Sequence, residues 1–224
     1  LGVQDVLITV TIAEDAYEGD IRYVDVTVTS VGDDTVSEVI STSTSTLQFA
    51  DLDNEAPGAE YEEPDRTVEF DFIITNRGNG EDSFTIEAES EHGWNLTLYI
   101  YWESIRIVVT ETTVLDRDEE QTVMVEVEIP HDTAAGITDQ VTLTATSTFN
   151  DTVSSASSTN VTVLQFADLD NEAPGAEYEE PDRTVEFDFV ITNRGNGEDS
   201  FTIEAASGHD WNLTLSDSET GTLD

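Results

Sequence analysis

The sequence contains no cysteine and no lysine, and its 224 residues carry only seven basic side chains against 50 aspartates and glutamates. Without cysteine, the chain can form neither a disulfide framework nor a thiolate metal site. The formal net charge of -43 would repel the phosphates of nucleic acids and the head groups of anionic membranes. We therefore expect neither nucleic acid nor an anionic membrane surface among its partners.

Long apolar runs and catalytic side chains are also scarce. No stretch reaches the roughly 18 apolar residues of a membrane-spanning helix, so we expect no direct membrane insertion within this segment. Leu1 is neither an initiator methionine nor the start of a signal peptide, so we expect any targeting or anchoring segment outside this sequence. Histidine occurs only at positions 92, 131 and 209, without a recognisable nucleophile and base. We predict that the chain is not an enzyme and holds no cofactor, calcium apart.

The excess of carboxylates is typical of proteins that work in concentrated salt. At ordinary ionic strength these charges would push a folded chain apart, but at ~1 M salt the screening length falls to about 3 Å. In this respect the composition resembles that of haloarchaeal proteins, which indicates an environment and no activity. A merely acidic surface protein from an organism without salt adaptation is the alternative.

The chain contains an internal repeat. Residues Leu47–Leu98 return at Leu164–Leu215, shifted by 117 positions, with 48 of 52 residues identical. At the same shift, residues 1–46 align with residues 118–163 at 16 of 46 positions. The repeat unit is therefore predicted to be about 117 residues long.

The phase of the repeat divides the chain unevenly. If a unit begins at Leu47, residues 47–163 form a complete unit, residues 1–46 the back half of one and residues 164–224 the front half of another. Either the sequence is a window on a longer tandem array, whose flanking chain completes the partial units, or the back half of one copy completes the front half of its neighbour. The second arrangement would join copies of this chain head to tail, because an unpaired sheet edge accepts an added strand and an open-ended contact propagates.

Alternation of apolar and polar residues dominates the sequence, as half-buried strands require. Val68, Phe70, Phe72 and Ile74 fall on one face of a predicted strand, and helical spacing is nowhere sustained. With about seven or eight short strands per unit, we predict an all-β fold of tandem immunoglobulin-like β-sandwich repeats, the first and last of them partial. The Asn-Gly pair at 79–80 is a hairpin signal between two strands. Almost no linker is left between units, so they should be stiffly joined.

A family resemblance rests on five motifs of the middle unit: Thr75–Phe84, Gly93-Trp94, Val127–Pro130, Ala135-Gly136 and Val141–Ser147. In this succession they resemble the immunoglobulin-like accessory domain found beside alpha-galactosidases and, as tandem repeats, in haloarchaeal cell-surface proteins. The resemblance covers the middle unit and, through the repeat, both partial ones. It implies a sandwich used as a spacer, surface-layer or adhesion module, and it implies no catalytic residues.

Two features depart from the family pattern. The middle unit carries about ten additional residues around Tyr99–Ile107 compared with the last repeat, and the first unit lacks its front half. The addition contains the aromatic cluster Tyr99, Tyr101 and Trp102. We expect this cluster to be an extra edge strand that covers the core of the complete unit, or else a patch that stacks on sugars or docks another subunit.

Acidic side chains at alternate positions form a candidate calcium site. The two sets are Asp51, Asp53 and Glu55 in one repeat and Asp168, Asp170 and Glu172 in the other. Calcium prefers clustered carboxylate and carbonyl oxygens, and the pattern loosely resembles the acidic linker of cadherins. It lacks the ligand loop of an EF-hand, so the competing interpretation is a solvated acidic edge.

Four N-x-S/T sequons are candidate glycosylation sites, at Asn95, Asn150, Asn160 and Asn212. Three of them fall on the outward phase of a predicted strand, and Asn150 falls in a turn. Glycans on these side chains would place the protein outside the cell.

Taken together, these features predict an extracellular structural protein at the cell surface, whose acidic sandwiches associate end to end in a filament, surface layer or stalk. The alternative is an adhesin or a carbohydrate-binding accessory module of a larger surface protein.

The charge balance generates the first prediction. Dialysis from ~3 M to ~0.1 M salt lengthens the electrostatic screening distance to about 10 Å, so it should unfold or disassemble the protein. Circular dichroism and sedimentation velocity along a salt series measure the two effects. Indifference of both signals to salt would contradict adaptation to brine.

Overall fold

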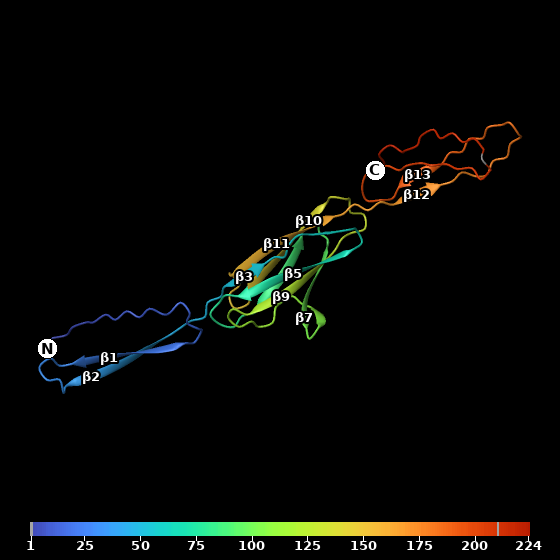
Figure 1. Cartoon of the computed structure of the whole chain (residues 1–224). Coiled ribbons are helices and arrows are strands. Elements are labelled where there is room, and N and C mark those ends of the chain that lie inside the picture. Colours follow the sequence, from blue (N-terminus) through green and yellow to red (C-terminus); the bar gives the residue numbers. More distant parts are fainter. Residues whose placement is uncertain (1, 210) are drawn as a thin grey trace.

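The computed structural model describes residues 2–209 and 211–224, and this part of the chain is built from β-strands without a helix (Figure 1). Accordingly, the described residues contain no helix that could span a membrane. The strands in chain order are β1 (Ile21–Thr29), β2 (Ser37–Ser45), β3 (Leu52–Glu55), β4 (Glu60–Glu62), β5 (Thr67–Asn76), β6 (Phe84–Ser90), β7 (Asn95–Trp102), β8 (Ile105–Val108), β9 (Glu120–Glu128), β10 (Thr138–Ser147), β11 (Ser154–Val163), β12 (Leu169–Glu172) and β13 (Val190–Asn193). The predicted all-β fold is confirmed.

Strands β3 to β11 form a sandwich of two sheets in the middle of the chain. One sheet has the order β3-β5-β9-β7-β8, and the other has the order β4-β11-β10-β6. Neighbouring strands are antiparallel, except that β4 runs parallel to β11. If β3 and β4 are taken as the two parts of a first strand, this is the immunoglobulin-like arrangement, with strands A, B, E and D in one sheet and C, F and G in the other.

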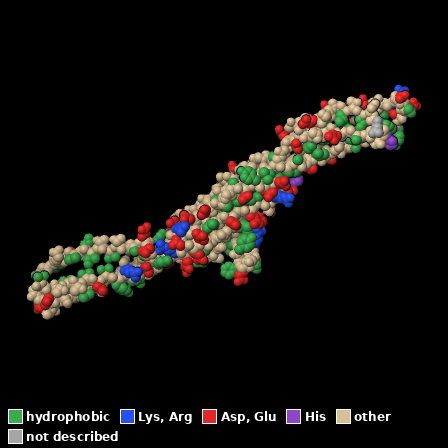
Figure 2. Space-filling model, viewed as in Figure 1, with side chains coloured by type: hydrophobic (Ala, Val, Ile, Leu, Met, Phe, Trp, Pro, Cys, Tyr) green, Lys and Arg blue, Asp and Glu red, His purple; other side chains and the backbone are tan. Residues whose placement is uncertain are grey.

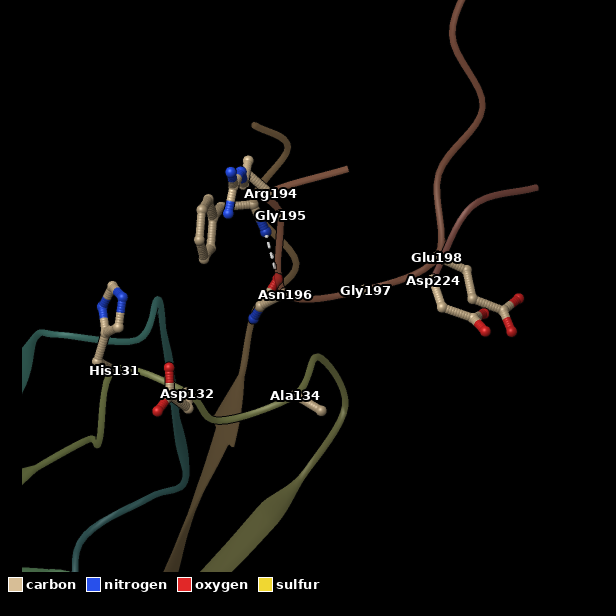
Figure 3. Close-up of a pocket in the computed structure, with 10 residues that line it drawn as sticks. His131, Asp132, Ala134, Arg194, Gly195, Asn196, Gly197, Glu198 and Asp224 are labelled. Atoms are coloured by element: carbon tan, nitrogen blue, oxygen red, sulfur yellow. Dashed lines mark hydrogen bonds between the residues drawn. The ribbon is translucent and has the colours of Figure 1, made fainter. Parts of the chain in front are cut away.

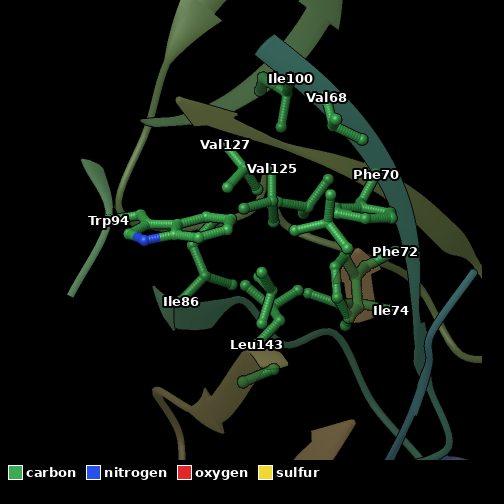
Figure 4. Packing of buried hydrophobic residues seen from close by; sticks show 14 of the residues in the cluster. Val68, Phe70, Phe72, Ile74, Ile86, Trp94, Ile100, Val125, Val127 and Leu143 are labelled. Atoms are coloured by element: carbon green, nitrogen blue, oxygen red, sulfur yellow. The ribbon is translucent and has the colours of Figure 1, made fainter. Parts of the chain in front are cut away.

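The core lies between the two sheets and follows from the alternation in the sequence (Figure 4). The inward row of β5, predicted from period two, is buried along its whole length at Val68, Phe70, Phe72 and Ile74. Strands β9 and β10 contribute buried rows of the same kind, and Trp94 closes one side of the cluster. Branched and aromatic side chains suit such a surface because they pack well on a pleated sheet.

The expected hairpin at the Asn-Gly pair of residues 79–80 is wrong. Strand β5 pairs with β3 and β9, whereas β6 pairs with β10 in the other sheet, so the turn between β5 and β6 crosses from one sheet to the other. The buried amide of Asn76 holds this crossing, since it donates to the carbonyls of Gly80 (2.9 Å) and Leu115 (2.8 Å). A polar turn of the same composition serves both kinds of connection, and therefore the local signal does not distinguish them.

Two shorter pieces extend from opposite ends of the sandwich (Figure 1). Residues 2–46, the N-terminal piece, contain the hairpin β1-β2, whose pairing Ile21↔Ser45 lies 117 positions before Thr138↔Thr162 of β10-β11. The C-terminal piece, residues 164–209 and 211–224, contains the pair β12-β13. Its pairing Leu169↔Asn193 lies 117 positions after Leu52↔Asn76 of β3-β5. Each piece therefore reproduces part of the central sandwich in the same register.

The packing of the core generates the second prediction. Phe72 is fully buried, so Phe72→Ala should lower the free energy of unfolding of the central sandwich by ~3–5 kcal/mol through lost burial and a new cavity. Tyr61→Ala, at an exposed residue of β4, is the control and should change it by less than ~0.5 kcal/mol. Denaturant unfolding at high salt measures both, and equal effects would contradict the described core.

Candidate assembly site at the two open ends

The N-terminal piece lacks the strands that would flank its first segment. In the central sandwich, β9 lies between β5 and β7 and pairs with both of them. The corresponding residues 2–11 of the N-terminal piece belong to no sheet. Val6 is 75% exposed, whereas its counterpart Val123 in β9 is fully buried. The apolar row of this segment therefore faces water.

The C-terminal piece has the converse deficit. Its sequence contains the counterparts of β3 to β7, of which the structure forms strands only at β12 and β13, the counterparts of β3 and of the end of β5. Phe189 is 59% exposed, whereas its counterpart Phe72 is fully buried. Trp211 is 77% exposed, whereas its counterpart Trp94 is 9% exposed. Side chains that form the core of the central sandwich thus form an open surface here.

The two pieces are complementary in strand content. The N-terminal piece supplies the counterparts of β9, β10 and β11, and the C-terminal piece supplies those of β3 to β7. Together the two sequences contain a counterpart for each strand of the central sandwich except β8. Figure 2 shows hydrophobic side chains along the opening of the N-terminal piece, in a surface otherwise marked by carboxylates.

One polar contact of the central sandwich has no counterpart between the pieces. The buried carboxylate of Asp139 accepts hydrogen bonds from the backbone N–H of His92 (2.7 Å) and lies 3.0 Å from Nδ1 of that ring. The position equivalent to Asp139 in the N-terminal piece is Arg22, an exposed side chain 3.8 Å from Asp20. A combined sandwich would therefore bring an arginine toward His209 in place of a carboxylate.

The β7-β8 hairpin carries the aromatic cluster and extends away from the sandwich (Figure 1). Its inner end packs on the core through Ile100, whereas Tyr101 and Trp102 are more than half exposed. The inner end of the hairpin therefore covers part of the core, and a role of the cluster in stacking on sugars or docking a subunit stays a prediction. The bridge Asp82↔Leu115 spans 33 positions and its counterpart Asp199↔Leu223 spans 24, so the hairpin accounts for nine additional residues.

Arg106 lies near the tip of this hairpin, opposite Tyr101, and its side chain connects the hairpin to the sheet. Its guanidinium lies 5.0 Å from the centre of the Tyr99 ring and forms ion pairs with Glu69 and Glu126. Hydrogen bonds to Tyr101 and then to Glu69 raise the pKa of Arg106, so this cation stays charged. The one arginine of the hairpin is therefore already paired with carboxylates of the same chain.

The acidic residues proposed for calcium lie on β3 and β12 or directly before them. In the first set, Asp53 forms an ion pair with Arg77 (2.9 Å), which also contacts Asp118 (3.1 Å), and Asp51 accepts from the backbone N–H of Leu52. Hydrogen bonds to Asp53 and then to Asp118 raise the pKa of Arg77.

The second set repeats the ion pair, with Arg194 3.4 Å from Asp170. Glu55 and Glu172 form no ion pair with an arginine or histidine among the described residues. Nowhere in the described part of the chain do three acidic or histidine side chains gather as a metal site. Calcium binding stays a prediction.

The sequons differ in exposure. Asn95 on β7, Asn160 on β11 and Asn212 are exposed, and the Asn95 amide donates to Glu128 (3.1 Å). Asn150 is half-buried, and its carbonyl oxygen accepts from the backbone N–H (3.2 Å) and the hydroxyl (2.8 Å) of Thr152. The geometry leaves the first three side chains accessible, and glycosylation stays a prediction at all four.

Comparisons with known proteins give no family. No protein-family model and no curated protein sequence matches the chain. Among solved structures, the YadV chaperone is 8% identical with a TM-score of 0.34, over 66% of this chain and 69% of that one. Domains 4 and 5 of the S-layer protein SbsC are 12% identical with a TM-score of 0.31, over 64% and 58%.

An enzyme also appears among the similar structures. A family 123 glycoside hydrolase from Clostridium perfringens is 9% identical with a TM-score of 0.33, over 53% of this chain and only 27% of that one. TM-scores of this size are too low to carry an argument about function.

Proposed function

We propose that the chain is an extracellular structural subunit in which incomplete sandwiches at the two ends complete each other between successive copies. The observation that carries the proposal is the pair of exposed apolar surfaces described above. Each surface consists of residues whose counterparts are buried in the central sandwich of the same chain. Contiguous apolar surfaces are typical of interfaces, because the free energy falls when apolar side chains leave water.

The register of the central sandwich specifies how the two pieces would fit. There, Phe72 of β5 lies opposite Val123 of β9, so Phe189 of one copy would lie opposite Val6 of the next. Residues 2–11 would enter as the middle strand between residues 184–193 and the segment that begins at Asn212. Hairpin β1-β2 would complete the second sheet. The structure already holds β1-β2 and β12-β13 in the pairing that this arrangement requires.

Apolar burial and salt together favour this association. A valine or phenylalanine that becomes fully buried contributes ~1.5–3 kcal/mol, and several such residues line each piece. The charge of -43 per chain opposes contact between copies, but screening in concentrated salt shortens the range of that repulsion. The same contact repeated at each end does not close on itself, and it would generate a filament, a stalk or a row within a surface layer.

Completion by flanking segments of a longer chain is the other arrangement that would bury these rows. It would give a tandem array in place of a polymer, with the same mechanical role and the same extracellular location. Neither arrangement requires catalysis.

A disulfide test distinguishes the two arrangements. Thr67 lies opposite Glu128 on the outer face, so Thr11→Cys and Thr184→Cys should lie opposite each other across the completed sandwich. Because the native chain has no cysteine, oxidation should give a ladder of covalent multimers on a denaturing gel. The control pairs Thr11→Cys with Val185→Cys, whose side chains point to opposite faces of the sheet. A ladder of equal intensity in the control, or only monomers in the matched pair, would contradict head-to-tail completion.

A second test uses the repeat itself as a matched control. Phe189→Ala should weaken multimer formation at least tenfold, because Phe189 is buried only in the completed sandwich. It should leave the unfolding of the central sandwich unchanged, in contrast to Phe72→Ala at the equivalent position. Sedimentation equilibrium and denaturant unfolding at high salt measure the two properties. Unchanged association in Phe189→Ala would overturn the proposed contact.

The exposed aromatic hairpin favours a second candidate function. Trp102 and Tyr101 project beyond the sandwich, and exposed aromatic rings are suited to stacking on sugars. In this case the protein would act as an adhesin or a carbohydrate-binding accessory module. Glycan-array binding that is lost in Trp102→Ser would support this role, and binding unaffected by the substitution would exclude the hairpin as the site.

A further inference from the structure

The junction between the N-terminal piece and the central sandwich is organised by one side chain. Asn79 is 2% exposed, and its carbonyl oxygen accepts from the backbone N–H of Phe49 (2.8 Å). Its amide donates to the carbonyls of Leu47 (2.9 Å) and Ala16 (3.4 Å). The backbone carbonyl of Asn79 accepts from the N–H of Glu18 (2.9 Å). A single asparagine thus connects the linker, the turn of the preceding piece and its own domain.

The same contacts occur at the junction with the C-terminal piece. Asn196 accepts from the N–H of Phe166 (2.9 Å) and donates to the carbonyls of Leu164 (2.9 Å) and Thr133 (3.2 Å). Its backbone carbonyl accepts from the N–H of Ala135 (2.9 Å). Every partner lies 117 positions from its counterpart in the first junction.

The two sides of the junction differ in sequence identity. The asparagine side belongs to the nearly identical repeat segment. The turns on the other side, residues 16–18 (Ala-Tyr-Glu) and residues 133–135 (Thr-Ala-Ala), differ at all three equivalent positions. The asparagine bonds only backbone atoms of these turns, and backbone atoms are the same whatever the side chains.

The glycines beside each asparagine explain how the turn approaches so closely. A Cβ atom at Gly78 would lie 2.7 Å from the carbonyl oxygen of Phe49, and one at Gly195 would lie 2.6 Å from that of Phe166. A Cβ atom at Gly197 would lie 3.2 Å from the Cβ of Ala135. The absence of side chains at these positions leaves room for the linker and for the turn.

From these contacts we infer that the loop around Asn79 and Asn196 is a docking surface for the turn of a preceding sandwich. It recognises the backbone of that turn, accepts different side chains there, and fixes the angle between consecutive domains. Its partner is the turn that leads into the β10-type strand of any upstream sandwich of this kind.

The side chains around the two junctions differ while the asparagine contacts persist. At the first junction Arg117 lies over the ring of Tyr17 (5.1 Å) and donates to the carbonyl of Asp15 (3.0 Å). At the second junction Ala134 takes the place of the tyrosine and lines a pocket of about 430 Å³ together with Asn196 and Asp224 (Figure 3). The hydrogen bonds of the asparagine are therefore common to both junctions, whereas the side chains around them are not.

The test measures distances within one chain by paired spin labels. Labels at Ser43→Cys and Ala156→Cys report on the first junction, and labels at Ala156→Cys and Thr192→Cys report on the second. The native chain offers no competing thiol, and dilution with unlabelled protein at high salt removes distances between copies. Each of the two pairs should give a single narrow distance distribution.

Matched variants distinguish the contribution of the asparagine from that of the side chains of the turn. Asn79→Ala should broaden the distribution at least twofold at the first junction and leave the second unchanged, and Asn196→Ala should do the reverse. Asn79→Asp keeps the acceptor for Phe49 but loses both donated hydrogen bonds, so it should broaden the first distribution even if the alanine variant folds poorly. Replacing residues 16–18 by Thr-Ala-Ala should broaden neither.

Two outcomes would overturn the inference. A narrow first distribution in both Asn79 variants would show that the asparagine does not fix the angle. A broad distribution after the exchange of residues 16–18 would show that the side chains of the turn are recognised. Because all distances lie within one chain, these outcomes are independent of whether copies associate head to tail.

Discussion

The pairing of β9 with both β5 and β7 is the interaction on which the rest of the structure depends. A middle strand contributes backbone hydrogen bonds on both edges, and its inward row of valines forms the centre of the core. The C-terminal piece has the flanking segments without this strand, and the N-terminal piece has the strand without its neighbours. The exposed apolar rows of both pieces contain the residues whose counterparts form this strand or pack on it in the central sandwich.

The charge pattern sets a second condition on assembly. The described core contains apolar side chains with few polar ones, so the carboxylates are concentrated on the outer faces of the strands. If copies associate, the attraction between them must come from the apolar rows, and the carboxylates outside these rows contribute repulsion. Salt changes the repulsion far more than the attraction. Screening weakens the interaction of exposed charges, whereas the burial of apolar side chains does not depend on charge. Under the proposed function, folding and assembly would therefore both depend on the ionic strength of the surroundings.

The sequence predicts the faces of the strands well and their partners poorly. The buried row Val68, Phe70, Phe72 and Ile74 follows from period two, which is a local property of one strand. The assignment of β5 and β6 to different sheets depends on partners distant in sequence, and the Asn-Gly pair at 79–80 carried no signal for it. The role of Asn79 in the junction was missed for the same reason, because its partners are backbone atoms of other segments. The comparison of the two repeats identifies the hairpin β7-β8 as an addition. Its projection beyond the sandwich does not follow from the sequence, because it depends on β8 lying at the edge of the sheet and pairing only with β7.

If copies associate as proposed, the junctions and the open ends would both rest on recognition of backbone atoms. At the junctions an asparagine side chain bonds backbone atoms of the turn, and at the open ends strands would pair through their backbones in a fixed register. Such recognition tolerates changes on one side while the geometry is retained, as residues 16–18 and 133–135 illustrate. If successive copies complete each other, every junction along the assembly lies within one chain and contains the contacts of Asn79 or Asn196. The angle between consecutive sandwiches would then be a property of the repeat, and the stiffness of a long assembly would follow from a short linker that is held by hydrogen bonds to the asparagine.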